Sequence, residues 1–434
     1  MNRSVLKLAI PSILANITIP LVGLVDTAIV GHIADATIIG GIAVGTMLFD
    51  LLYWNFGFLR VGTSGMTAQA FGRKDDRECA KLLAQSLTIT ALATAVIWLL
   101  QWLFVTAALA CVPCSDEVAD FARSYFFVRI WAAPATLALM ALKGWFIGMQ
   151  DTVSPMACDI VVNVVNMAAS YVLAVYTPLG AIGVAYGTVI AQFTGLLLAV
   201  IILFAKYGKF LAIWKTAELR VFRSLGRLMR LNTNLFIRSL CFMIVYVGFT
   251  AIAGGYGDVQ LAVSSILMKL FMLFSYFVDG FAYAGEALVG KYIGEGADEK
   301  TLSRVVRILF NWSIGVGVLF TLIYAFGGID CVRLMTDDED VLQAVRPFLG
   351  WLIAMPIVST LAFMWDGIYV GATAGKEIRN AMLWAAFGFV AGYAALYYWL
   401  GIQALYIAYF LHLTARVVYL TLKWKNVQKQ ILYE

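Results

Sequence analysis

Apolar residues dominate the chain in long runs that short polar connections separate. A helix of about 20 residues crosses a hydrocarbon core of ~30 Å. Twelve runs reach that length, near residues 8–33, 40–70, 82–109, 120–147, 155–176, 180–205, 228–253, 260–289, 305–328, 341–371, 381–400 and 402–422. A segment in lipid must satisfy its own backbone hydrogen bonds, so each run is predicted to be an α-helix. The pattern predicts an all-α integral membrane protein with twelve transmembrane helices.

Composition and charge agree with that prediction. Of 434 residues, 62% are hydrophobic and 13% are charged, which is too little polar surface to cover a soluble globule of this size. Lys and Arg gather in alternate connections, for example at 73–81 and 206–230, and at both ends of the chain. By the positive-inside rule both termini are cytoplasmic. The net charge of +5 is therefore a topology signal that gives no reason to expect nucleic acid. We expect a multi-pass protein of the cytoplasmic (inner) membrane.

The two halves of the chain repeat one another weakly. "TAIVG" at 27–31 matches "TAIAG" at 250–254, and two further segment pairs recur at offsets of 222 and 223 residues. Each copy holds six spans, so both cross the membrane in the same sense, as parallel repeats. We predict an N-terminal six-helix lobe (1–205), a basic cytoplasmic linker (206–227) and a C-terminal six-helix lobe (228–434), with a central cavity between the lobes.

One acid stands within the first apolar run. Asp26 occupies a position where the second repeat has Phe249. An ionised carboxylate inside a membrane costs a few kcal/mol, so such residues usually serve a function. The other interpretation is a structural partner for a buried cation such as Arg60 or Arg129. Since a packing requirement would tend to be met in both repeats, we favour function.

Polar side chains form a stripe in the fifth run, "ACDIVVNVVNMAASYVLAV". Asn163, Asn166 and Ser170 follow one another at spacings of three and four, which places them on one helix face. Thr188 in the sixth run can join them. Such stripes bind ligands or hold helices together, and the pattern does not separate the two.

Prolines and further charges mark other candidate positions. Pro11 and Pro20 precede Asp26 in its run, and each removes a backbone hydrogen bond, which makes this helix bendable. In the second half, Lys269, Asp279 and Asp366 can form an internal charge network. We favour a structural role for that network over transport, because paired charges are the least costly to bury.

Several quoted motifs together resemble one family. "PSILANITIPLVGLVDTAIVGHI", "FLRVGTSGMTAQAFGRKD", "GWFIGMQDT" and "DGIYVGATAGKEIRNAM" are similar to the MATE (multidrug and toxic compound extrusion) transporters, specifically the DinF branch. The resemblance implies two six-helix lobes around a central cavity. It also implies export of cationic or amphipathic drug-like molecules, driven by inward flow of protons or sodium ions.

The resemblance also carries over to single positions. It places the coupling acid of the first helix on Asp26, the asparagines of the fifth helix on Asn163 and Asn166, the threonine of the sixth on Thr188, and a tyrosine of the fourth on Tyr125. The branch often has an acid where this chain has Ser170. That departure leaves Asp26 as the sole acid of the cluster, so we favour proton over sodium coupling.

Other functions fit the sequence less well. A lipid-linked oligosaccharide or lipid flippase has a similar architecture and is the alternative function. That function would be indicated by a strongly cationic cavity. An intramembrane enzyme would need paired acidic metal motifs, and the one "DDED", at 337–340, has no counterpart. Cys111 and Cys114 lack the second ligand pair of a zinc site, and the sequence does not decide whether they form a disulfide. We therefore expect a monomeric transporter without catalytic residues, metal ligands or cofactor other than its coupling ion.

Overall fold

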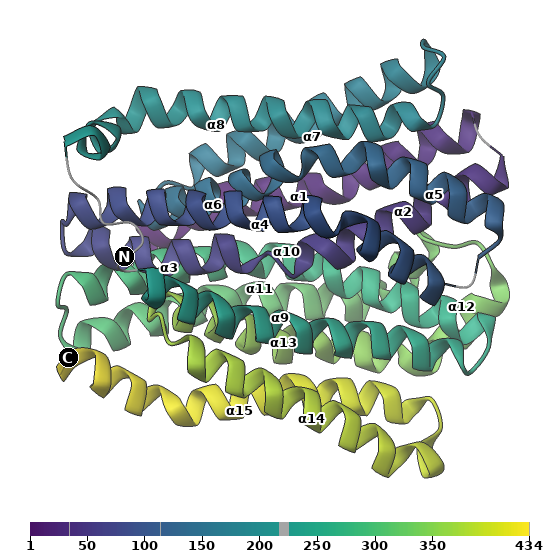
Figure 1. Cartoon of the computed structure of the whole chain (residues 1–434). Coiled ribbons are helices and arrows are strands. Elements are labelled where there is room, and N and C mark those ends of the chain that lie inside the picture. The colour runs from purple at the N-terminus through teal and green to yellow at the C-terminus, as the bar shows by residue number, and fades with distance from the viewer. Residues whose placement is uncertain (34, 113, 217–224, 434) are drawn as a thin grey trace. The chain divides into compact units, whose positions relative to one another are not determined.

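The computed structural model describes residues 1–33, 35–112, 114–216 and 225–433 of the chain (Figure 1). Within these ranges the regular structure is helical and no strand occurs. The helices are α1 (Asn2–Ile33), α2 (Ala36–Trp54), α3 (Phe58–Gly72), α4 (Asp76–Cys111), α5 (Asp116–Arg129), η1 (Ile130–Ala132), α6 (Ala133–Gly148), α7 (Val153–Val175), α8 (Ile182–Thr216), α9 (Leu225–Gly254), α10 (Asp258–Gly294), α11 (Glu299–Arg333), α12 (Glu339–Val345), η3 (Arg346–Phe348), α13 (Leu349–Gly371), α14 (Gly375–Leu400) and α15 (Gln403–Tyr433).

The described helices provide twelve spans long and apolar enough to cross a membrane, which confirms the prediction. Some spans combine several elements. The fourth joins α5, η1 and α6, and the tenth joins α12, η3 and α13. In both, a proline, Pro134 or Pro347, follows or lies in the short 3-10 turn. Because proline has no backbone N–H to donate, each of these spans departs from α-helical geometry close to its proline.

The chain divides into two compact units. The N-terminal unit contains residues 14–71 and 75–228, and the C-terminal unit contains residues 1–13, 72–74 and 229–434. Helix α1 is helical through both of its prolines, and its residues divide between the units after Ile13, between Pro11 and Pro20. Gly280 explains why the start of α1 groups with the second unit. A Cβ there would lie 2.4 Å from a side-chain carbon of Ile13, so glycine lets α10 approach α1 closely.

The segment predicted as a linker is partly helical. Helix α8 continues through residues 206–216, although Tyr207 departs from helical geometry (φ −123°, ψ 20°). Residues 217–224 of the predicted linker lie outside the described residues, and α9 begins at Leu225.

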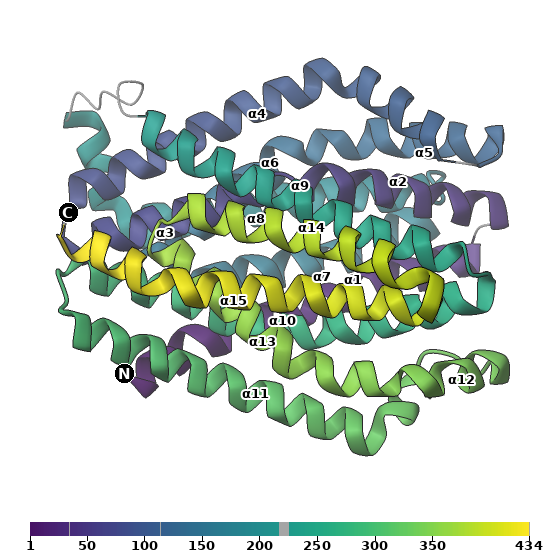
Figure 2. The same ribbon diagram turned by 90° about the horizontal axis from the view of Figure 1, so that it is seen from below.

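In each unit the most extensive helix packing joins two helices that are neighbours in the chain. In the N-terminal unit α7 packs along α8, and in the C-terminal unit α14 packs along α15 (Figures 1 and 2). The C-terminal unit buries an aromatic core in which Phe249 is 1% exposed and meets the rings of Tyr406 and Tyr409 edge-on, at 5.6 and 5.5 Å between ring centres. The position equivalent to Asp26 is thus part of a buried aromatic core in the second repeat.

Candidate functional site

Asp26 lies on α1 in the N-terminal unit, with a partly buried side chain. Its Oδ1 atom is buried and has no hydrogen-bond partner in the described part of the chain. Arg129 of α5 and the Ser170 hydroxyl of α7 lie close enough to interact with its carboxylate. The acid therefore has a cation and a hydroxyl nearby while one of its oxygens remains without a partner.

The polar stripe of α7 connects this helix to its neighbours. The Asn163 amide donates to the hydroxyl of Thr18 on α1. The Asn166 amide donates to the hydroxyl of Thr188 on α8 over 3.0 Å, and Thr188 in turn donates to the Val184 carbonyl. The structure thus brings three predicted residues, Asn163, Asn166 and Thr188, into hydrogen bonds between helices, the arrangement that holds membrane helices together.

The same stripe retains free acceptor oxygens. Ser170 is fully buried, and neither its Oγ nor the Oδ1 of Asn166 has a hydrogen-bond partner among the described residues. Gly187 of α8 allows this packing, since a Cβ there would lie 2.6 Å from Ser170 Oγ. Buried polar atoms without partners are costly, so they are expected where a ligand, ion or water binds. These oxygens, with Asp26, can accept a proton donor or help to coordinate a small cation.

Helices α2 and α5 pack in a regular register. A Cβ on Gly41 would lie 2.6 Å from the Phe121 ring, and one on Gly45 would lie 2.6 Å from the Tyr125 ring. One turn further along both helices, the Arg129 guanidinium lies 4.8 Å from the centre of the Phe49 ring. Small residues allow such close approach of membrane helices. The two glycines of α2 thus bring the end of α5, with Arg129, against Phe49.

Arg129 is the partly buried cation near Asp26 and Asp50. It donates a hydrogen bond to the Tyr125 hydroxyl over 3.3 Å, while its Nε atom is buried without a hydrogen-bond partner in the described chain. Asp50, Asp26 and Tyr53 all lie within range of its charge. The structure therefore places Asp26 near Arg129, the cation that the sequence offered as its alternative partner, and places Tyr125 in the same cluster.

Asp50 corrects the interpretation of Asp26 as the sole acid of this cluster. It lies on α2 beside Phe49, has an exposed side chain and is attracted to Arg129. The signal was present in the sequence, because "LFDLLYW" puts an acid in the middle of an apolar run. Its spacing from Asp26 and Arg129 along the chain gave no indication that the three would meet.

An apolar cavity of about 650 Å³ lies in the same unit. Residues of α2, α4 and α5 line it, including Leu48, Ile97, Phe104 and Phe126. The Phe126 ring stacks on Phe49, whose ring faces Arg129. Apolar walls next to a few charged groups are typical of sites for small amphipathic molecules.

Asp366 of the C-terminal unit has two cationic partners. One of its oxygens lies 2.6 Å from Nη2 of Arg416 and 3.0 Å from Nη2 of Arg238. Arg416 is almost fully buried on α15, and Arg238 belongs to α9. Of the other residues of the predicted network, Lys269 and Asp279 lie on α10, and Lys269 is exposed. Two arginines held in place by the fold compensate the charge of Asp366, and this arrangement favours a structural role for it.

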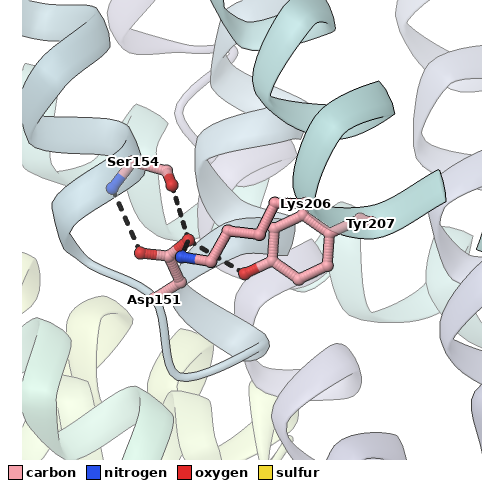
Figure 3. A network of polar contacts seen from close by, with 4 residues as sticks. All are labelled: Asp151, Ser154, Lys206 and Tyr207. Atoms are coloured by element: carbon pink, nitrogen blue, oxygen red, sulfur yellow. Dashed lines mark hydrogen bonds and ion pairs between the residues drawn. The ribbon is translucent and has the colours of Figure 1, made fainter.

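A second polar network surrounds Asp151, in the connection between α6 and α7 (Figure 3). Its carboxylate accepts hydrogen bonds from the Ser154 backbone (3.1 Å), the Ser154 hydroxyl (2.5 Å), Lys206 (2.7 Å) and the Tyr207 hydroxyl (2.9 Å). Burial alone would raise the pKa of Asp151, but these donors favour the ionised form and hold the pKa below its ordinary value. Sequence reasoning did not identify this network, which ties the α6–α7 connection to α8 at Lys206 and Tyr207, where α8 departs from helical geometry.

The cysteines and the possible metal ligands show no sign of a further reactive site in the described part of the chain. All six cysteines, including Cys111 and Cys114, have free thiols. Among the described residues, no three His, Cys, Asp or Glu side chains are grouped so that they could hold a metal ion.

Comparison with known proteins identifies the family. The family model described as MatE matches residues 11–172 and 235–413. The chain belongs to the MATE family. Its members are transporters, so this protein is a transporter and not an enzyme.

Two curated relatives and one solved structure extend this result. DNA damage-inducible protein F of Escherichia coli (strain K12) is 35% identical over 98% of this chain and 92% of its own length. Human multidrug and toxin extrusion protein 1 is 22% identical, over 91% of this chain and 69% of its own. A crystal structure of MATE in complex with MaL6 has the same fold, with a TM-score of 0.87 and 16% identity, over 100% of this chain and 97% of that one. The resemblance to MATE transporters and to the DinF branch is thereby confirmed.

Proposed function

We propose that this MATE transporter is a proton-coupled antiporter that exports cationic or amphipathic drug-like molecules by alternating access. It works as a monomer in the cytoplasmic (inner) membrane, with both termini in the cytoplasm. The alternation of Lys and Arg between connections supports this orientation. The names of relatives, such as human multidrug and toxin extrusion protein 1, support a small-molecule substrate.

One observation carries the proposal. The Oδ1 atom of Asp26 is buried within a membrane span and has no hydrogen-bond partner among the described residues. A carboxylate in this setting is energetically unfavourable, so its presence indicates a functional role in which it binds and releases ligands. A proton or an organic cation can bind it in turn, which is the minimal requirement for antiport. Protonation neutralises Asp26, weakens its attraction to Arg129 and lets α1 bend near Pro11 or Pro20.

The proton is favoured over sodium for a physical reason. A sodium ion gives up its hydration shell only for several oxygens that carry enough negative charge. Ser170 offers a neutral hydroxyl, and Arg129 places a fixed positive charge within range of Asp26. A proton needs only the carboxylate. The unpaired oxygens of Asn166 and Ser170 could coordinate a sodium ion. Sodium coupling is therefore the alternative that the experiment must distinguish from proton coupling.

A flippase for lipid-linked oligosaccharides is the alternative function. Its substrates carry phosphate, and a site for phosphate needs an excess of Arg or Lys. The N-terminal unit's site contains two acids, Asp26 and Asp50, around Arg129. This balance supports a cationic substrate.

The decisive experiment is efflux of a fluorescent organic cation from proteoliposomes under separately imposed proton and sodium gradients. We expect the wild type to respond to the proton gradient alone, and Asp26→Asn to fold and export little or nothing. Asp120→Asn is the matched control, because it removes an acid whose side chain is 76% exposed on α5. It should keep wild-type efflux.

Two results would contradict the proposal. Wild-type efflux from well-folded Asp26→Asn would remove the acid from the mechanism. Efflux that follows a sodium gradient at fixed pH, without response to a proton gradient, would replace the proton by sodium and leave the exporter itself intact.

A further inference from the structure

We propose that Arg129 determines the substrate specificity of this site. Its fixed positive charge, set against Asp26 and Asp50, leaves the site with one net negative charge and so favours substrates that carry a single positive charge. The inference rests on the proposed function, since it concerns which cations the exporter accepts.

The guanidinium of Arg129 lies within range of both acids, but it makes its contacts with Phe49 and Tyr125. Arg129 lies 4.8 Å from the centre of the Phe49 ring and donates to Tyr125 over 3.3 Å. An aromatic face attracts a cation, so these contacts stabilise the guanidinium away from a closed ion pair. Its Nε atom and Oδ1 of Asp26 are both buried without hydrogen-bond partners in the described chain. The acids remain available to another cation.

The placement of Arg129 follows from backbone packing. Gly41 and Gly45 of α2 meet Phe121 and Tyr125 of α5, and the next turn brings Arg129 against Phe49. Asp50 is the neighbour of Phe49 on α2, and its exposed side chain can be reached by a ligand. Since two packed helices hold the groups, the guanidinium cannot leave the site as a free cation would.

The charge balance predicts which ligands bind. Two carboxylates and one guanidinium sum to a charge of −1 when all are ionised, so one proton or one monovalent cation makes the site neutral. A dication leaves it positive. In a medium of low dielectric constant an uncompensated charge is strongly disfavoured, so a dication should bind less well. The same balance makes exchange of one proton for one monocation the neutral cycle.

Two dyes test this balance directly. Ethidium carries one positive charge, and propidium has the same phenanthridinium ring with a second charge on its side chain. Both are titrated into purified, detergent-solubilised full-length protein, and dissociation constants are obtained from fluorescence anisotropy. The measured quantity is the ratio of propidium to ethidium affinity, which cancels differences in the amount of active protein.

Four variants test the charge of the site, two by changing it and two by keeping it at the wild-type value. Arg129→Gln makes it −2, Asp50→Asn makes it 0, and the double variant returns it to −1. Arg129→Lys keeps the charge and changes the shape. We expect Arg129→Gln to raise the affinity ratio about tenfold, the effect of one unit charge in a partly screened site. Asp50→Asn should weaken ethidium about tenfold and propidium about a hundredfold, which lowers the ratio about tenfold. The double variant and Arg129→Lys should both have the wild-type ratio.

The outcomes separate the two proposals. If the wild type binds neither dye, the proposed function fails, and this inference fails with it. If the wild type binds ethidium but the ratio in Arg129→Gln equals that of the wild type, only the charge inference is overturned. A double variant whose ratio departs from the wild-type ratio as far as that of either single variant would overturn it as well. Should Arg129→Gln fail to elute as a single species in size-exclusion chromatography, Asp50→Asn decides, because a ratio equal to that of the wild type in this variant would overturn the charge inference.

Discussion

Removal of the Asp151 carboxylate should destabilise the N-terminal unit. Asp151 accepts from both Ser154 groups, from Lys206 and from Tyr207 (Figure 3), and its side chain is 5% exposed. Asp151→Ala deletes all four contacts. Asp151→Asn keeps one acceptor oxygen and removes the charge.

The magnitude follows from the burial of each partner. Lys206 is 54% exposed, so water screens its ion pair, which contributes only about 0.5 kcal/mol. The Tyr207 side chain is buried, and a buried hydroxyl left without an acceptor costs about 1–3 kcal/mol. The Ser154 hydroxyl is similarly affected. We therefore expect Asp151→Ala to lower the free energy of unfolding by about 3 kcal/mol, and Asp151→Asn by about half of that.

The effect should depend on pH in a defined direction. The pKa of Asp151 is lowered in the folded protein, because hydrogen bonds from Lys206 and Ser154 outweigh the effect of burial. A carboxyl group of this kind stabilises the fold at pH values above its ordinary pKa of 3.8. That stabilisation is lost as the pH falls through the lowered folded pKa. The difference between wild type and Asp151→Ala should be constant near pH 7 and should narrow below about pH 4.

The assay is thermal denaturation in detergent, followed by size-exclusion chromatography of the protein that remains folded. The control is Asp76→Ala, which removes an ion pair with Lys209 in which both side chains are at least half exposed. Its melting temperature should stay close to that of the wild type, since exposed pairs contribute 0–1 kcal/mol. An Asp151→Ala melting temperature equal to the control, or a difference that does not narrow in acid, would refute the argument.

Two further predictions concern packing. Gly45→Leu should push the Tyr125 ring away, because even a Cβ would lie 2.6 Å from it. As Arg129 leaves its place, we expect the ratio of propidium to ethidium affinity to rise by up to about tenfold, as in Arg129→Gln, while Gly315→Leu, whose Cβ meets nothing within 4 Å, should keep the wild-type ratio. Phe249→Asp should give no second coupling site and should destabilise the C-terminal unit by about 3 kcal/mol or more, since it buries an unpaired acid between Tyr406 and Tyr409. Thermal denaturation measures the loss of stability. Proton-driven efflux by the double variant Asp26→Asn with Phe249→Asp would contradict the absence of a second coupling site.

The apolar runs by themselves determined the twelve spans and the helical fold. Lipid offers no hydrogen-bond partners to the backbone, so a run of sufficient length has one stable conformation whatever surrounds it. Local spacing was equally sufficient for the polar face of α7. Asn166 and Ser170 are four residues apart, and helix geometry alone puts them on one side. The sequence also identified Asp26, since an acid within an apolar run is costly in any tertiary context.

Partners that are distant in the chain were decided only by the tertiary structure. Asp50 and Arg129 belong to different helices, and their meeting depends on the close approach of α2 and α5 at Gly41 and Gly45. The sequence grouped Asp366 in one network with Asp279 and Lys269, whereas the structure shows Arg416 and Arg238 as the cations paired with Asp366. A helix presents a whole cylinder of side chains, and the periodicity of one helix does not state which neighbour packs against which face. The sequence shows which charged residues lie within apolar runs, but the partners that compensate those charges are determined only by how the helices pack.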